Sequence, residues 1–67
     1  MSPSSLHRIC HESWELIQTF RGPTIPREGE MLLLEQGGQE AKYRVTGVMY
    51  RPAPGGELLA TVFVKPA

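Results

Sequence analysis

The sequence predicts a mainly β fold, a small antiparallel barrel or roll of four to five strands. Two observations support this prediction. Seven Gly and six Pro divide the 67 residues into segments of strand length, and the chain has no Asp or Asn to make turns in their place. Three of these segments also have the apolar pattern or the β-branched content of strands. We expect a single domain over residues 1–67, in which residues 1–12 form a loosely ordered N-terminal segment.

Two predictions remain open for the first 21 residues. The first is a helix over about residues 3–20, packed on a three-stranded antiparallel sheet in an α+β fold. Ser2 and Pro3 are typical of a helix start, and Gly22 and Pro23 are typical of the end of one. Seven apolar side chains then fall on one half of a helical wheel: Leu6, Ile9, Cys10, Trp14, Leu16, Ile17 and Phe20.

The second prediction for this region is a strand over Ser13 to Arg21, preceded by a shorter strand or a loose tail. Its side chains are middling helix formers with no Ala or Lys among them. In this arrangement Trp14, Leu16 and Phe20 face inward. The neighbouring strands favour this β interpretation, and the helix is its alternative.

The segment from Glu30 to Gln36 is compact and apolar, and Gly37 and Gly38 close it. Glycine adopts positive φ without a steric penalty, so this pair predicts a tight hairpin turn. The segment from Glu57 to Lys65 places Leu58, Ala60, Val62 and Val64 on one face, and it predicts the last strand.

Between these two segments, Lys42 to Arg51 predicts a strand with an irregularity. Tyr43 and Val45 share one face, but after Gly47 the apolar and aromatic positions are Val48 and Tyr50. A glycine at the point where the alternation slips by one residue indicates a β-bulge.

One stretch resembles a pattern in small phage and mobile-element proteins. The stretch is Pro26-Arg27-Glu28-Gly29-Glu30, followed by an apolar strand and then Tyr43-Arg44-Val45-Thr46-Gly47-Val48. In those proteins a Pro-Arg-x-Gly-acid turn introduces a strand of a small barrel, often SH3-like. The resemblance covers residues 20 to 50 and implies an SH3-like barrel of phage or mobile-element origin. It implies no functional residue.

Composition excludes several classes of protein. The formal net charge is zero, with seven basic and seven acidic residues, which argues against a strongly basic polyphosphate binder. One cysteine cannot form a disulfide within the chain. The longest apolar run is Met31 to Leu34, too short for a membrane span or a signal peptide. We expect a cytoplasmic protein with no membrane partner.

The segment from His7 to Glu12 holds both histidines and the only cysteine. His7, Cys10 and His11 are weak candidates for zinc ligands, because structural zinc takes four protein ligands and the chain has no other His or Cys. Cys10 beside His11 could also supply a thiolate nucleophile. On a strand, however, neighbouring side chains point to opposite sheet faces. We therefore expect no metal, no cofactor and no catalytic residue.

Nucleic acid is a disfavoured partner. Small barrels bind single strands through aromatic platforms and a basic groove, and the chain offers Trp14, Tyr43, Arg44, Tyr50 and Arg51 for this purpose. A net charge of zero, with Glu residues interleaved among the basic ones, supplies little of the counterion release that drives such binding.

The function that the sequence favours is a non-enzymatic protein-interaction or adaptor module. Its apolar residues exceed what one face of a small sheet can cover, which predicts apolar surface on two sides and either a homo-oligomer or another protein as partner. The alternatives are a barrel that binds single-stranded nucleic acid and a small enzyme whose site forms at a subunit interface. The predicted binding residues are Trp14, Tyr43, Arg44, Tyr50, Arg51 and Phe63.

Overall fold

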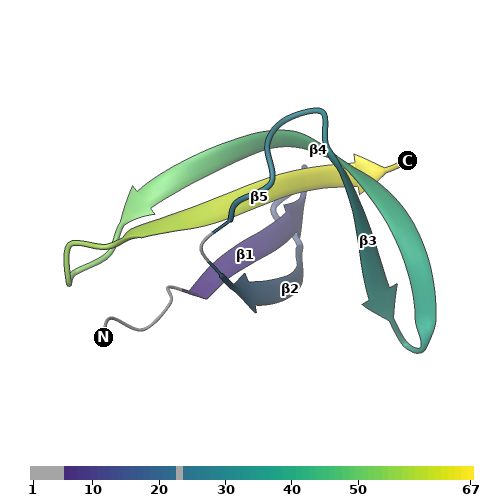
Figure 1. The fold of residues 1–67 in the computed structure, drawn as a ribbon, viewed down its shortest axis with the longest axis horizontal. Coiled ribbons are helices and arrows are strands. Elements are labelled where there is room, and N and C mark those ends of the chain that lie inside the picture. Colours follow the sequence, from purple (N-terminus) through teal and green to yellow (C-terminus); the bar gives the residue numbers. More distant parts are fainter. Residues whose placement is uncertain (1–5, 23) are drawn as a thin grey trace.

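Five β-strands form one sheet that curls into a half-barrel (Figure 1). The computed structural model describes residues 6–22 and 24–67. The strands are β1 (Leu6–His11), β2 (Leu16–Arg21), β3 (Met31–Gln36), β4 (Gln39–Pro52) and β5 (Leu58–Pro66). The predicted mainly β fold is confirmed.

The helix alternative is wrong for residues 6–20, since these residues form β1, a turn and most of β2. β1 lies inside the sheet, between two other strands, and it carries apolar side chains on both faces. Its apolar residues therefore do not alternate strictly, and their spacing resembles that of an amphipathic helix. Residues 6–11, expected to be loosely ordered, are this strand. Residues 1–5, which include the proposed helix start at Ser2 and Pro3, lie outside the described residues, as does Pro23 at the proposed helix end.

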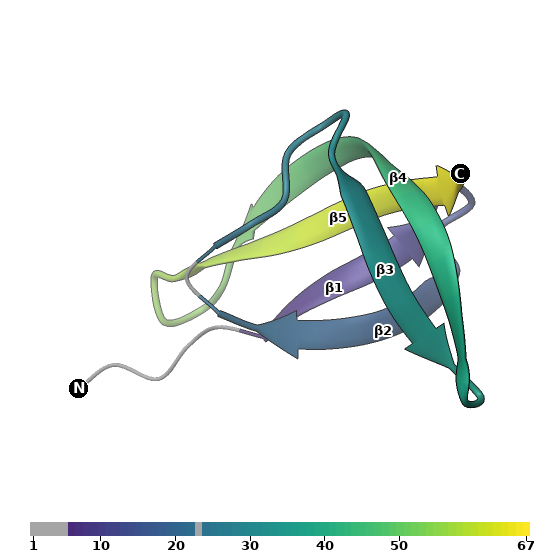
Figure 2. The ribbon, with the colours of Figure 1, turned by 45° about the vertical axis from the view of Figure 1, so that its right-hand side comes forward.

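The strands are ordered β2-β1-β5-β4-β3 across the sheet. Neighbours pair antiparallel except β1 and β5, which run parallel. This parallel pair joins the N-terminal hairpin to the end of the chain. β2 and β3 are the two edge strands of the sheet (Figure 2).

The predicted β-bulge lies in β4. Val45 pairs with Val64 and Gly47 pairs with Phe63, so Thr46 is the extra residue. The Thr46 hydroxyl donates a hydrogen bond to the carbonyl oxygen of Phe63 over 3.3 Å. A bulge bends its strand and increases the twist, and the bent β4 pairs with β3 along its first half and with β5 along its second.

The core lies on the inner, concave face of the sheet. The alternation predicted for β5 is confirmed, because Ala60, Val62 and Val64 are buried there. Their buried apolar neighbours come from three other strands: Ile9, Leu34, Tyr43 and Val45.

His7 is the one buried polar side chain among the described residues. Its Nδ1 accepts a hydrogen bond from the backbone N–H of Ala60 over 2.9 Å, and its ring packs against Phe20. A buried N–H without an acceptor is costly. His7 therefore provides the acceptor for the backbone N–H of Ala60, the residue of β5 just before the pairing of β5 with β1 begins.

The segment from Pro26 to Glu30 forms a turn that leads into β3. The Glu30 carboxylate accepts a hydrogen bond from the backbone N–H of Arg27 over 2.5 Å. The backbone N–H of Glu30 donates to the backbone carbonyl of Arg27 over 3.0 Å. Gly29 and Glu30 then exchange backbone hydrogen bonds with Val45 of β4. The predicted turn before the strand is confirmed, while the resemblance to mobile-element proteins stays a prediction.

Candidate functional site

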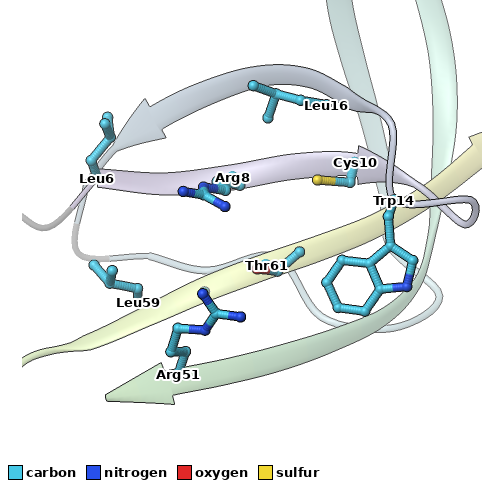
Figure 3. Close-up of a pocket in the computed structure, with 9 residues that line it drawn as sticks. Leu6, Arg8, Cys10, Trp14, Leu16, Arg51, Leu59 and Thr61 are labelled. Atoms are coloured by element: carbon cyan, nitrogen blue, oxygen red, sulfur yellow. The ribbon is translucent and has the colours of Figure 1, made fainter. Parts of the chain in front are cut away.

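A pocket of about 120 Å³ lies on the outer face of the sheet, opposite to the core. We call it the outer pocket (Figure 3). Its lining is apolar apart from two arginines and one threonine. The lining residues are Leu6, Arg8, Cys10, Trp14, Leu16, Arg51, Leu59, Ala60 and Thr61.

The strand register explains why these residues meet. Arg8 of β1 lies beside Thr61 of β5, and Leu59 lies beside Arg51 of β4. Side chains two residues apart on a strand point to the same face. The floor of the outer pocket is therefore a row across β1, β5 and β4, the three central strands of the sheet.

Trp14 stands beside this floor on the turn between β1 and β2. The backbone N–H of Trp14 donates a hydrogen bond to the backbone carbonyl of His11 over 2.8 Å. The backbone N–H of His11 donates to the backbone carbonyl of Glu15, also over 2.8 Å. Trp14 has a φ of 76°, in the left-handed region, and no other described non-glycine residue has a positive φ. Hairpins with such a turn usually place glycine at the left-handed position. A side chain there costs about 1–2 kcal/mol.

Trp14 is 56% exposed, although its ring touches a neighbouring ring. It meets Phe63 edge to face, with ring centroids 4.7 Å apart. A second, more open hollow is also lined by Trp14 and includes Glu12, Met49 and Phe63. Trp14 therefore borders two adjoining hollows.

The charge of the outer pocket is positive. Among the described residues that line it, Arg8 and Arg51 are the only ionisable side chains besides the Cys10 thiol, and none is a carboxylate. Both arginines are exposed, and within the described chain neither guanidinium has a hydrogen-bond or ion-pair partner. Figure 3 shows Arg51 reaching toward Arg8 across β5.

A second apolar groove, which we call the seam, lies between β2 and β3. It has a volume of about 440 Å³ and is lined by Ile9, Gln18, Phe20, Thr24, Pro26, Glu30, Met31, Leu32 and Leu34. No Cα atom of β2 lies within 8 Å of a Cα atom of β3. Paired strands lie about 4.8 Å apart. The edge strands β2 and β3 therefore do not pair with each other, and the barrel is not closed.

The structure brings together three of the six predicted binding residues. Trp14, Arg51 and Phe63 share the outer face. Tyr43 is buried in the core, where its hydroxyl donates to Gln36 Oε1 over 3.3 Å. Arg44 is exposed further along β4, opposite Met31, and Tyr50 is exposed on the inner face, opposite Ala60.

The inward orientation predicted for Trp14 and Leu16 is wrong, although Phe20 does pack on the core. Gln18 pairs with Ile9 but Leu16 pairs with Cys10, so Ile17 is an extra residue in β2. This irregularity moves Leu16 to the outer face, beside Cys10.

The structure separates the candidate metal ligands. Cys10 lines the outer pocket, whereas His7 and His11 contact rings on the inner face, those of Phe20 and Tyr43. Among residues 6–22 and 24–67, no three side chains of the types His, Cys, Asp and Glu lie close enough to hold a metal ion. Cys10 and His11 therefore do not form a nucleophile and base pair.

Arg8, Leu6 and Thr61 are pocket residues that sequence analysis did not identify. Arg8 stood inside the segment considered for metal binding. The signal that could have found these residues is the alternation of Leu6, Arg8 and Cys10 in a strand, but only together with the parallel pairing of β1 and β5.

Comparisons with protein-family models, curated proteins and solved structures found no match to this chain. In the part of the chain that the structure describes, no helix is long and apolar enough to cross a membrane.

Proposed function

We propose that this protein is a non-enzymatic interaction module that binds a segment of another protein across the outer pocket. One observation carries the proposal: an exposed tryptophan occupies a left-handed backbone position beside a pocket. Backbone strain of this kind is concentrated at functional sites, where it is retained for what the side chain does.

The surroundings of Trp14 support the same function. Leu6 and Leu16 are 43% and 53% exposed at the pocket, and Met49 is 49% exposed in the adjoining hollow. Contiguous apolar surface with a few polar groups marks protein-interaction sites. Tryptophan and arginine are also the residues that most often dominate the binding energy of such sites.

Selection from a random peptide library displayed on phage tests this proposal. The immobilised full chain is the bait, and the Trp14→Gly variant is the counter-bait. We expect enriched peptides that bind the wild-type chain at least about tenfold more tightly than the variant, since a central aromatic anchor contributes about 2 kcal/mol or more. Peptides that bind both chains equally, or no enrichment at all, would contradict the proposal.

The seam supports a second candidate function, self-association. The outer edges of β2 and β3 pair with no strand among the described residues. The groove between them is lined mainly by apolar side chains, which include Phe20 and Leu32. Exposed strand edges readily pair with another chain, so a second copy could join them.

Light scattering after size exclusion tests this second candidate. We expect a wild-type dimer at micromolar concentration that the Gln18→Lys variant loses, because Gln18 lines the seam and an inward charge there prevents docking. Thr19→Lys is the matched control, since Thr19 is exposed on the other face of β2. A wild-type monomer at every concentration would exclude self-association through the seam.

A further inference from the structure

We propose that the outer pocket recognises a carboxylate that lies next to an apolar side chain in a peptide partner. This inference rests on the proposed function and specifies the chemistry of the partner. The carboxylate is either a chain terminus or that of an acidic side chain, because both present the same planar group to a guanidinium. Arg8 and Arg51 are the two residues that hold it.

The two arginines lie on the strands that flank β5, and both line the outer pocket. Arg8 lies beside Thr61, and Arg51 lies beside Leu59, two residues away on the same face of β5. Strands about 4.8 Å apart and a rise of about 3.3 Å per residue separate the two Cα atoms by about 12 Å. Two extended arginine side chains can reach one group between them across this distance, and Figure 3 shows Arg51 directed toward Arg8.

The second feature is the charge of the pocket. Arg8 and Arg51 lie on the two strands that flank β5, and two positive charges that line one pocket repel each other. Neither arginine has a partner within the described chain, and no carboxylate lines the pocket to neutralise them. An anion between the two guanidinium groups would relieve this repulsion. Arginine binds carboxylates through paired N–H donors, which gives both strength and orientation.

The third feature is the apolar wall. Leu6, Leu16 and Leu59 surround the charged pair, and Trp14 completes the wall. A cavity of about 150 Å³ accommodates benzene, so a pocket of about 120 Å³ has room for one small group of a ligand. A carboxylate at the arginines then places the neighbouring apolar side chain against the leucines and the indole.

The same surface disfavours a single-stranded nucleic acid. Such ligands need several aromatic platforms in succession and a basic groove. Here Trp14 is the one exposed aromatic side chain on the described outer face, since Phe63 is only partly exposed and Tyr50 lies on the inner face.

The experiment is an NMR titration of the ¹⁵N-labelled full chain with four probes. N-acetyl-leucine carries a terminal carboxylate, and N-acetyl-Leu-Glu-amide carries a side-chain carboxylate. N-acetyl-leucine amide is the neutral control, and oligothymidylate is the nucleic-acid probe. We expect saturable shifts at Arg8, Trp14 and Thr61 with at least one carboxylate probe, and the stronger binder of the two identifies the source of the carboxylate.

Three variants separate the arginines from the rest of the pocket. Arg8→Ala and Arg51→Ala should each weaken carboxylate binding about tenfold, as expected for the loss of a hydrogen bond to a charged group. Arg44→Ala is the matched control on β4, because Arg44 is exposed outside the pocket. This control should bind as the wild-type chain does.

Each contrary result has a distinct meaning. An affinity for the neutral N-acetyl-leucine amide equal to or greater than that for both carboxylate probes would overturn the carboxylate inference and leave the interaction module standing. Tighter binding of oligothymidylate than of either carboxylate would overturn it in favour of nucleic acid. No shift at the pocket with any probe would overturn it as well, while the peptide selection separately decides whether the proposed function stands.

Discussion

At the scale of single residues, Trp14 combines an unfavourable backbone conformation with high solvent exposure. Its φ of 76° places a large side chain where a hairpin turn favours glycine. Its contact with Phe63 recovers only part of the cost, because an aromatic pair contributes about 0.5–1.5 kcal/mol. Trp14 as a whole residue stays more than half exposed. We attribute its unusual backbone position to the proposed binding function.

A pair of substitutions measures the backbone strain at Trp14. Trp14→Ala and Trp14→Gly both remove the indole, but only glycine also removes the penalty of the left-handed position. We expect Trp14→Gly to be the more stable of the two by about 1 kcal/mol in urea unfolding, after allowance for the greater freedom of glycine in the unfolded chain. An alanine variant as stable as the glycine variant would show that the turn stores no strain.

At the scale of elements, β4 depends on two glycine-containing features that differ in physical origin. Gly37 and Gly38 form the turn from β3 with φ values of 59° and 83°. Gly47 lies at the bulge with an ordinary φ, and nothing lies within 4 Å of the position that a Cβ would take. The turn requires glycine for its backbone conformation, whereas the bulge depends on the extra residue, Thr46.

Alanine substitutions distinguish these two features. Gly38→Ala should destabilise the protein by about 1 kcal/mol, because alanine resists positive φ and no clash contributes at this open position. Gly47→Ala should change the free energy of unfolding by less than about 0.5 kcal/mol, or stabilise the protein slightly. Thermal unfolding of both variants gives the comparison, and a larger loss at Gly47 would contradict this account of the bulge.

The elements also show what could be predicted from the sequence. The three C-terminal strands, the turn at Gly37 and the bulge at Gly47 follow from patterns within a few residues, and all are confirmed. The first 21 residues were ambiguous because an irregular hairpin with apolar residues on both faces has no clean period of two. The parallel pairing of β1 with β5 joins the two ends of the chain, and no local pattern encodes it.

The candidate site was predicted only in part for the same reason. Trp14, Arg51 and Phe63 were identified by residue type, and the structure places them on one face. Arg8 joins them only through the pairing of β1 with β5. Tyr43, another residue identified by type, is buried in the core instead.

At the scale of the whole molecule, the half-barrel leaves apolar surface on both faces of one sheet. The inner face carries a small core of buried apolar side chains. The seam, the groove between β2 and β3, lies next to this core. The outer face carries the outer pocket and exposed leucines. We attribute this exposed apolar surface to the proposed binding function.

The central claim is that Trp14 and its pocket receive a peptide from another protein. Trp14 is the only tryptophan of the chain, so intrinsic fluorescence during titration with a selected peptide reports on this site alone. We predict the emission of a water-exposed indole in the free protein and a saturable shift to shorter wavelength as peptide binds. Emission of a buried indole in the free protein, or no change at saturating peptide, would contradict the claim.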